Sequence, residues 1–385
     1  MKTLIALCLL CSLLSFDDVL AARPQMPAQY MLDEDRPAGP LHAPPGYYQP
    51  VTGTRGADFT CPSLLPPYTG SLVFPSKYAG SDRARDVINP AASAEYERLT
   101  GTLRTFEKTV SGLADRFAVT GGDPRILECF LNQVASWAEA QALLDRECNE
   151  IGMASRKWLL AATASAWLQV SLAAPEQMAR YRQQVDRVET WFTKLAAAVQ
   201  EDYSGRDLKH INNHDYWAGW AVMATAVVLD RRDLFVWAFN RLRIAVNEQA
   251  TADGFLPNEL RRRTRALLYH NYAMGPLTMI LVFAEANDIH LSDTEAAGFR
   301  RLADRVVEGI GRPSVFADVT GSPQELDGLR EPYSLAWLLP YGTVFQADEA
   351  MRRLISGYDR MVSTRLGGNL TRLYGPFRLN TPPSS

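Results

Sequence analysis

The sequence lacks the short motifs that mark several large enzyme classes. It contains no GxSxG nucleophile elbow, no phosphate-binding P-loop, no GxGxxG segment leading into a helix and no HExxH zinc motif. These absences argue against a serine hydrolase of the nucleophile-elbow type, a P-loop nucleotidase, a dinucleotide-dependent enzyme and an HExxH zinc protease. Any catalytic chemistry must therefore be carried by residues outside these motifs.

A strong charge of either sign is also absent. The 385 residues have a formal net charge of −3, so the overall field gives no reason to expect nucleic acid or an anionic membrane as a partner. A preference for a charged ligand would have to come from a local cluster. Hydrophobic residues make up 47% of the chain, enough to build the core of one large domain or two medium ones.

The longest purely apolar run lies at the N-terminus, where residues 1–22 have the features of a secretory signal peptide. Lys2 supplies the positive charge, the stretch TLIALCLLCSLLSF is too short to span a bilayer, and Ala21 and Ala22 offer small residues for cleavage. No later segment is interpreted as a membrane-spanning helix. We therefore expect an exported, soluble protein that does not insert into a membrane.

Cysteine is scarce, and removal of the signal peptide leaves only Cys61, Cys129 and Cys148. Two of these three can pair in an oxidising compartment, and the sequence alone does not determine which two. We favour Cys61–Cys129, because that pair would join a loop-like N-terminal segment to the helical body. Cys148 is then expected to be free and buried.

Runs of alternating Val, Ile and Thr, which are typical of strands, are missing as well. Residues 23–90 are rich in Pro and Gly and predict an extended arm over the surface rather than a separate domain. Residues 91–385 show helical periodicity and are predicted to form one all-α domain of antiparallel helical hairpins. The predicted helices lie near residues 92–118, 124–145, 150–171, 175–201, 213–230, 231–251, 265–288, 294–311, 329–340 and 346–361.

The hydropathy of two of these helices indicates how they are arranged. The segment Trp217–Leu229 is apolar on all faces, which a surface helix does not tolerate. The segment Glu176–Gln200 is amphipathic and heavily charged. Buried helices that alternate with amphipathic ones favour an inner ring shielded by an outer one, as in an incomplete α/α toroid; a large irregular bundle fits less well. A toroid has a groove at one end of its inner ring.

The stretch KHINNHDYWAGW allows three interpretations. His210 and His214 have the i, i+4 spacing of two zinc ligands, but a third ligand and a general base are not apparent. An asparagine here can simply cap the helix that follows. Alternatively, Asn213 and His214 are polar groups that face a ligand. Trp217 and Trp220 continue the stripe from Asn213, although paired tryptophans are more often core than a sugar platform.

A second cluster lies in DGFLPNELRRRTRALLYHNYAM, which contains four arginines within five residues. If the segment is helical from about residue 260, Arg262, Arg265, Tyr269 and Tyr272 lie near one face. Guanidinium groups beside tyrosines suit an anionic ligand such as a carboxylate, and a neighbouring arginine would lower the pKa of Tyr269. A solvated basic turn with core tyrosines is an equally supported alternative. In the arm, the motif FPSKY offers Lys77 and Tyr78 as a lid.

These motifs together resemble those of the periplasmic alginate lyases of polysaccharide lyase family 5. The resemblance rests on NNHDYWAGWAVM and LPNELRRRTRALLYHNYA, and extends to ADFTCP, FPSKY, RKWLLAATASAWL, DRRDLF and LAWLLPY. It covers nearly all of the chain after the signal peptide. It implies an incomplete α/α toroid, a periplasmic location, action as a monomer, and cleavage of polymannuronate by β-elimination. No metal or other cofactor is implied.

The resemblance also implies roles for individual residues. Tyr269 is expected to act as base and then acid, His214 as a neutraliser of the substrate carboxylate or an assisting base, and Asn213 and Arg262 as groups that bind the carboxylate. The expected substrate-binding residues are Lys77, Tyr78, Trp217 and Arg265. Asp215 departs from the serine of the family motif, and a carboxylate there is expected to raise the pKa of His214.

Two other functions remain open from the sequence. One is a lyase that acts on a different polyuronate, such as glucuronan or an acetylated mannuronan. The other is a non-catalytic polyuronate-binding protein that assists polymer export, although the presence of both His214 and Tyr269 argues against it. The family's role in clearing polymer from the periplasm is also compatible with contacts to export machinery.

Overall fold

A computed structural model describes residues 37–53, 58–78, 80 and 84–375 of the chain. The predicted signal peptide lies outside these residues. Eight long helices carry the fold. They are α1 (Pro90–Val119), α2 (Pro124–Glu139), α3 (Glu150–Ala173), α5 (Arg182–Tyr203), α6 (Asn213–Leu229), α7 (Arg232–Ile244), α9 (Ala266–Glu285) and α10 (Asp293–Gly311).

The remaining elements are short. The short helices are α4 (Pro175–Met178), α8 (Pro257–Leu260), α11 (Ser314–Thr320), α12 (Pro332–Leu335), α13 (Leu338–Val344), α14 (Glu349–Ile355) and α15 (Leu370–Tyr374). Two antiparallel strands of two residues each, β1 (Val362–Ser363) and β2 (Gly368–Asn369), flank the 3-10 turn Thr364–Leu366. A π-helical turn, Ala245–Gln249, follows α7.

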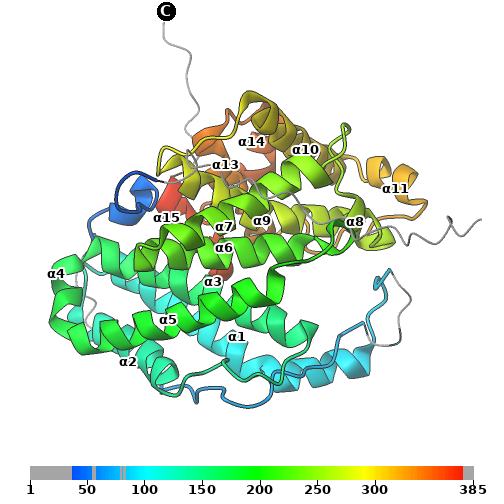
Figure 1. The fold of residues 1–385 in the computed structure, drawn as a ribbon. Coiled ribbons are helices and arrows are strands. Elements are labelled where there is room, and N and C mark those ends of the chain that lie inside the picture. Colours follow the sequence, from blue (N-terminus) through cyan, green and yellow to red (C-terminus); the bar gives the residue numbers. More distant parts are fainter. Residues whose placement is uncertain (1–36, 54–57, 79, 81–83, 376–385) are drawn as a thin grey trace, which may run out of the picture.

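The long helices form two layers (Figure 1). Helices α1, α3, α6, α9 and α13 pack against one another in that order and make the inner layer. Helices α2, α5, α7 and α10 pack on their outer side. The 3-10 turn Thr364–Leu366 contacts α1, α3 and α9. This arrangement confirms the predicted all-α class and the incomplete α/α toroid.

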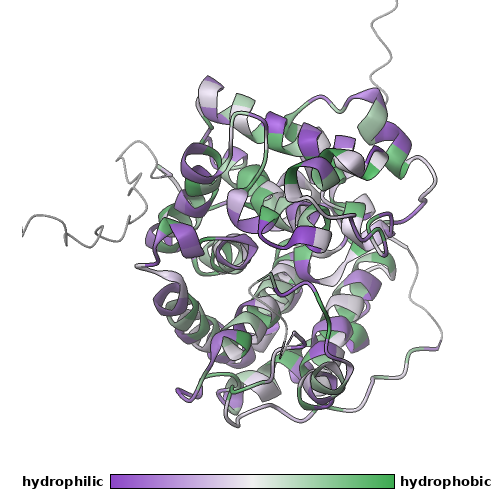
Figure 2. Ribbon diagram, turned by 90° about the vertical axis from the view of Figure 1, so that its right-hand side faces the viewer, coloured by the Kyte–Doolittle hydropathy of each residue, from purple (hydrophilic) through white to green (hydrophobic). Residues whose placement is uncertain are grey.

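The layering follows from the burial of the two kinds of helix. Every residue of α6 from Asp215 to Val227 is buried, whereas α5 buries one face that includes Val188, Trp191 and Leu195. In Figure 2 several helices at the rim are seen nearly end-on, with hydrophilic faces outward and hydrophobic faces inward. Because an all-apolar helix gains most when no face meets water, α6 takes an inner position.

Local signals set the starts of several helices. Asp123 caps α2 with Pro124 in the first turn, and Ser292 and Glu295 form a reciprocal capping box at α10. Several predicted helices are shorter than expected or divided: 124–145 ends at Glu139, 329–340 is divided between α12 and α13, and 346–361 is reduced to α14. Helix α11 was not predicted, because seven residues are too few to establish a periodicity.

One prediction about hydropathy is corrected. The segment Arg263–Glu285 is long and apolar enough to cross a membrane by length and composition, although no such segment was interpreted in the sequence. Within the protein, 83% of its most apolar window is buried. The apolarity of this segment reflects its place in the inner layer, where neighbouring helices cover it.

Among the contacts that hold the N-terminal arm to the helical body are a disulfide and a backbone pairing. Cys61 and Cys129 form a disulfide, which is the pairing favoured from the sequence. The backbone of Leu72 pairs with the loop that precedes α3, and a Cβ on Gly152 would lie 1.9 Å from the Leu72 carbonyl oxygen. Gly152 therefore permits this close approach. Cys148 is free as expected, but it is only partly buried.

We predict that the disulfide contributes substantially to stability. It closes a loop with a sequence separation of 68 residues, for which the chain-entropy model gives about 4 kcal/mol. Urea unfolding of Cys61→Ser should show a loss of this order relative to the wild type. Cys148→Ser removes a free thiol and is the matched control. Equal unfolding midpoints for Cys61→Ser and Cys148→Ser would contradict the prediction.

Candidate active site

A cavity of about 420 Å³ lies where the N-terminal halves of the inner helices meet. Its walls include Tyr96 from α1, Trp158 from α3, His214 from α6 and Tyr269 from α9. Because the N-terminus of each helix carries a partial positive charge and free N–H groups, this end of the ring favours anions. The predicted groove at one end of the inner ring corresponds to this cavity.

The charges of the side chains that line the cavity also favour an anion. Glu97 is the one acidic residue among those that line the cavity. The basic residues that line it are Lys77, Arg85, Arg104, Arg262, Arg265 and Arg365. A chain with a net charge of −3 thus gathers a positive cluster at a single cavity, which is the local cluster that binding of an anion requires.

Tyr269 lies in the first turn of α9 and contacts two groups from other segments. Its hydroxyl accepts a hydrogen bond from Nη2 of Arg262 at 2.9 Å and lies 2.8 Å from the hydroxyl of Tyr78. The Arg262 guanidinium also lies 4.0 Å from the centre of the Tyr269 ring. The arm therefore brings Tyr78 directly onto the tyrosine that was predicted to be catalytic.

The path of the backbone differs from the single helix predicted from residue 260. Helix α8 ends at Leu260, Arg263 has a left-handed φ of 47°, and α9 begins at Ala266. The break separates the two arginines: Arg262 reaches Tyr269, whereas Arg265 donates to the Tyr78 hydroxyl at 3.3 Å. Both arginines also donate to arm carbonyls, of Arg85 and Asp86 respectively.

The pKa of Tyr269 is raised rather than lowered, although Arg262 acts in the expected direction. Burial of the phenol raises its pKa well above the ordinary range, and this effect outweighs the guanidinium beside it. The neighbouring phenol of Tyr78 has a lowered pKa instead: burial raises it, but the hydrogen bond with Tyr269 and the charges of Lys77, Arg265 and Arg262 more than offset that effect. The two phenols share one hydrogen bond, and the neighbouring cations favour the ionised form of the pair.

His214 lies in the first turn of α6 with one ring nitrogen turned inward. Its Nδ1 lies 2.8 Å from Nζ of Lys157, and its ring packs on Trp158 with centroids 5.7 Å apart. Burial lowers the pKa of His214 well below the ordinary range, and the positive charges of Lys157, Arg206 and Arg262 lower it further. The expectation that Asp215 would raise this pKa is therefore wrong.

The structure explains why an aspartate is accommodated at position 215. Its side chain accepts a hydrogen bond from the backbone N–H of Asn212 at 3.0 Å, while Asn212 accepts one from the N–H of His214, so the two residues form a capping box. The same carboxylate accepts a hydrogen bond from Arg206 at 3.0 Å and is fully buried. Asp215 thus caps α6 and pairs with Arg206.

Asn213 is held by a buried carboxyl group. Glu259 in α8, only 1% exposed, accepts from the backbone N–H of Asn213 at 2.5 Å and from its Nδ2 at 3.0 and 3.1 Å. An amide nitrogen carries two hydrogens, so one remains for a ligand in the cavity. Burial raises the pKa of Glu259 from 4.5 to about 7, although the bonds from Asn213 oppose the shift.

His210 and the tryptophans of the same stretch lie outside this cluster. His210 is exposed in the 3-10 turn Leu208–His210, so it does not share a helix face with His214. Among the described residues, no group of three or more His, Cys, Asp or Glu side chains is placed to hold a metal ion. Trp220 is buried, and its indole donates to the carbonyl of Arg365 at 2.7 Å.

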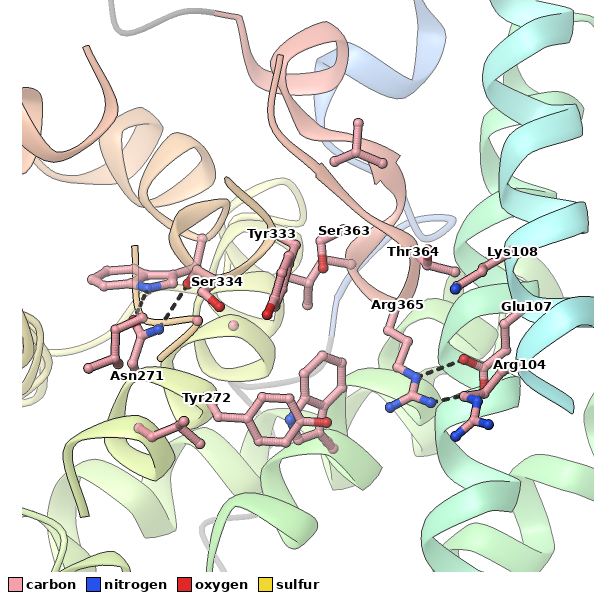
Figure 3. Close-up of a pocket in the computed structure, with 18 of the residues that line it drawn as sticks. Arg104, Glu107, Lys108, Asn271, Tyr272, Tyr333, Ser334, Ser363, Thr364 and Arg365 are labelled. Atoms are coloured by element: carbon pink, nitrogen blue, oxygen red, sulfur yellow. Dashed lines mark hydrogen bonds and ion pairs between the residues drawn. The ribbon is translucent and has the colours of Figure 1, made fainter. Parts of the chain in front are cut away.

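Trp217 lines a second cavity, of about 620 Å³, that adjoins the first. The two cavities share four lining residues: Arg104, Leu268, Tyr272 and Arg365. Figure 3 shows Tyr272 and Tyr333 between Asn271 on one side and Arg104, Glu107 and Lys108 on the other. Arg365 enters from the 3-10 turn and donates to both carboxylate oxygens of Glu107, at 2.8 and 3.3 Å.

Sequence reasoning missed several residues that the structure places at the site. They are Lys157, Trp158, Glu259 and Arg365. Lys157 left a signal, since the pair Arg156–Lys157 opens an otherwise apolar helical stretch, RKWLLAATASAWL. Arg365 left none, because it lies in a short turn about a hundred residues from the other motifs.

Comparison with known proteins supports the same conclusion. Residues 73–316 match the family model described as alginate lyase. The chain is 40% identical to an alginate lyase of Pseudomonas fluorescens (strain SBW25) over 341 residues, which cover 88% of this chain and 91% of that protein. It is also 40% identical over 337 residues to an alginate lyase of Pseudomonas aeruginosa strain PAO1, with the same coverage.

Solved structures show the same architecture. The fold is similar to that of a variant of alginate lyase A1-III complexed with a tetrasaccharide, with a TM-score of 0.71, 26% identity and coverage of 88% of this chain and 91% of that one. The crystal structure of alginate lyase A1-III from Sphingomonas species A1 gives a TM-score of 0.68. Fold and site thus define a polysaccharide lyase built on an α/α toroid. The chain belongs to the alginate lyase family.

The burial of Glu259 predicts a pH dependence of stability. The folded protein holds this proton to about pH 7, whereas the unfolded chain releases it near pH 4.5. Wild-type stability should therefore fall as pH rises through this window, by about 3 kcal/mol for the full shift. Glu259→Gln lacks this dependence. Urea unfolding at pH 5 and pH 8 measures the difference, and parallel curves for the two proteins would rule the prediction out.

Proposed function

We propose that the protein is a mannuronate-specific alginate lyase that cleaves polymannuronate by β-elimination in the periplasm. The observation that carries the proposal is the Tyr269 hydroxyl, held between Arg262 and Tyr78 in a cavity with six basic side chains. Elimination next to a uronate carboxylate needs a base for the C5 proton, an acid for the departing O4, and positive or hydrogen-bonding groups for the carboxylate. All three kinds of group are present.

The base and the acid are assigned to one residue. In a mannuronate unit the C5 proton and O4 lie on the same side of the ring, so Tyr269 takes the proton as a phenolate and returns one to O4 as a phenol. The phenolate forms against Arg262 and the hydrogen bond to Tyr78. Because burial raises the pKa of Tyr269, the phenolate is a strong base once formed, and the rate should increase as pH rises above neutral.

Binding of the substrate's carboxylate is assigned to the groups on the α6 side of the cavity. Asn213 and His214 begin α6, whose N-terminus favours negative charge. The guanidinium of Arg262 adds a positive charge beside them. Together these groups stabilise the negative charge that builds on the carboxylate after the C5 proton leaves. Because protein groups supply this stabilisation, the proposal requires no metal.

The second cavity supports a polymeric substrate. It continues from the first through Tyr272 and Arg365, and it adds the wall of Trp217 and the exposed Tyr333. Aromatic faces suit the faces of successive sugar units, and the arginines suit their carboxylates.

The location is proposed from the N-terminus and the disulfide. Residues 1–22 have the pattern of a signal peptide, and a disulfide between Cys61 and Cys129 suits an oxidising compartment. A periplasmic enzyme would clear polymer that is stranded during export, with or without contact to the export machinery. Osmotic-shock fractionation of the native host tests the periplasmic location, and recovery of the protein with the cytoplasmic fraction would refute that location.

The substrate is tested by incubating the purified protein, with chelator and no added metal, separately with polymannuronate, polyguluronate, glucuronan and acetylated mannuronan. We expect the ultraviolet absorbance of the unsaturated product to rise with polymannuronate and to rise much less with polyguluronate. A rise only with glucuronan or acetylated mannuronan would assign another polyuronate. Binding of polymer without any product would identify a binding protein instead.

Tyr269→Phe tests the assignment of the acid and base. We expect kcat to fall on the order of 10⁴-fold, since both proton transfers are lost, while affinity for polymannuronate changes little. Tyr181→Phe, on the outer side of the ring between α4 and α5, is the matched control. Turnover of Tyr269→Phe at the wild-type rate would show that another residue moves the proton.

A further inference from the structure

Lys157 is a fully buried lysine that the proposed mechanism does not use. It lies in α3 with 0% exposure, and its Nζ makes hydrogen bonds to the Tyr203 hydroxyl at 2.7 Å and to Nδ1 of His214 at 2.8 Å. Burial of an amino group is costly unless its hydrogen bonds are satisfied. A lysine kept in such a place, joined to a residue of the active cavity, is therefore a candidate for a role in the reaction.

The chemistry of the two partners limits the direction of the bond to His214. An ammonium has three donors and no acceptor, so a charged Lys157 makes Nδ1 an acceptor. A neutral amine has two N–H donors, one for each partner, and a lone pair that can accept; measurement of the ring state separates donation to Nδ1 from acceptance. The aromatic faces of Trp158 and Tyr203, with centroids 5.0 and 4.6 Å from Nζ, add attraction for a positive charge.

The surroundings of His214 oppose a second proton on its ring. The groups that face it or its lysine from each neighbouring segment are Lys157 and Trp158 of α3, Asp202 and Tyr203 of α5, Arg206 before α6, Asp215 of α6, Arg262 after α8, Arg85 of the arm and Arg365 of the 3-10 turn. Positive charges outnumber negative ones in this set, and Asp215 is paired with Arg206. The imidazole is thus kept neutral.

We infer that Lys157 is a positioning residue that donates to Nδ1 of His214 and so holds the ring neutral, with its proton on Nε2 and available to the cavity. An Nε2–H group is a hydrogen-bond donor for a carboxylate, but it has no lone pair with which to remove a proton. His214 therefore binds the substrate carboxylate and does not act as the base. The role of His214 in the reaction rests on the proposed function, whereas the protonation state of its ring does not.

The ring state can be measured without substrate. The chain has only five histidines, so long-range ¹H–¹⁵N spectra of protein with ¹⁵N-labelled histidine can resolve them, with His214→Gln to assign the signal. We expect His214 to remain in the neutral Nε2–H form between about pH 5 and 8. A neutral Nδ1–H form, or a charged ring at pH 7, would overturn the inference, even if no variant of Lys157 folds.

Lys157→Met tests the cause. We expect the His214 signal to show loss of the fixed Nε2–H tautomer, because Nδ1 no longer has its donor, and kcat on polymannuronate to fall about ten- to a hundred-fold, the loss seen when a group that orients a ligand-binding residue is removed. Thr163→Val is the matched control, since Thr163 is a buried polar residue of the same helix and bonds only within it, to the Leu159 carbonyl.

The two hypotheses fail separately. If Lys157→Met leaves both the tautomer and the titration of His214 unchanged, the assignment of Lys157 is wrong whatever the enzyme cleaves. If Thr163→Val changes the His214 signal as much as Lys157→Met does, the effect is one of packing and the assignment is also wrong. If the wild type cleaves no polyuronate, the proposed function fails while the spectra still decide the state of His214.

Discussion

The burial of α6 on every face is the constraint on which the rest of the structure depends. Its apolar sequence requires neighbours on all sides, which α3, α5, α7 and α9 supply. An inner layer shielded by an outer layer is the result. The N-terminal halves of α1, α3, α6 and α9 then line one cavity, where their dipoles and the nearby arginines attract an anion. The polysaccharide-binding end of the molecule follows from where its most apolar helices are placed.

Partial burial of the site gives its polar groups unusual protonation states. Burial is the largest influence on Tyr269, His214 and Glu259, and it favours the neutral form of each. Arginines, which do not lose their charge, supply the fixed positive potential. Each neutral group is oriented by a second polar residue: Tyr269 by Arg262, His214 by Lys157 and Asn213 by Glu259. These pairs spare each buried group the cost of an unmade hydrogen bond.

The arm completes the site from outside the ring. The disulfide to α2 and the backbone pairing at Leu72 hold its course, and Arg262 and Arg265 bind its carbonyls near Arg85 and Asp86. This path brings Tyr78 onto Tyr269 across 191 residues of sequence. The two guanidinium groups thus line the cavity and hold the arm with the same side chains, so the proposed substrate binding would be energetically linked to the position of the arm.

Local patterns in the sequence determined the helical class and the two layers, because periodicity and capping depend on neighbours along the chain. The resemblance of its motifs indicated the family and the expected site residues Asn213, His214, Arg262 and Tyr269, which line one cavity. The sequence favoured Cys61–Cys129 without determining the pairing, which the structure decided. Only the tertiary structure decided that Asp215 caps α6, that Lys157 contacts His214 and Glu259 holds Asn213, and that the pKa of Tyr269 rises and that of His214 falls. Those outcomes depend on desolvation and on contacts between distant segments, which no local pattern contains.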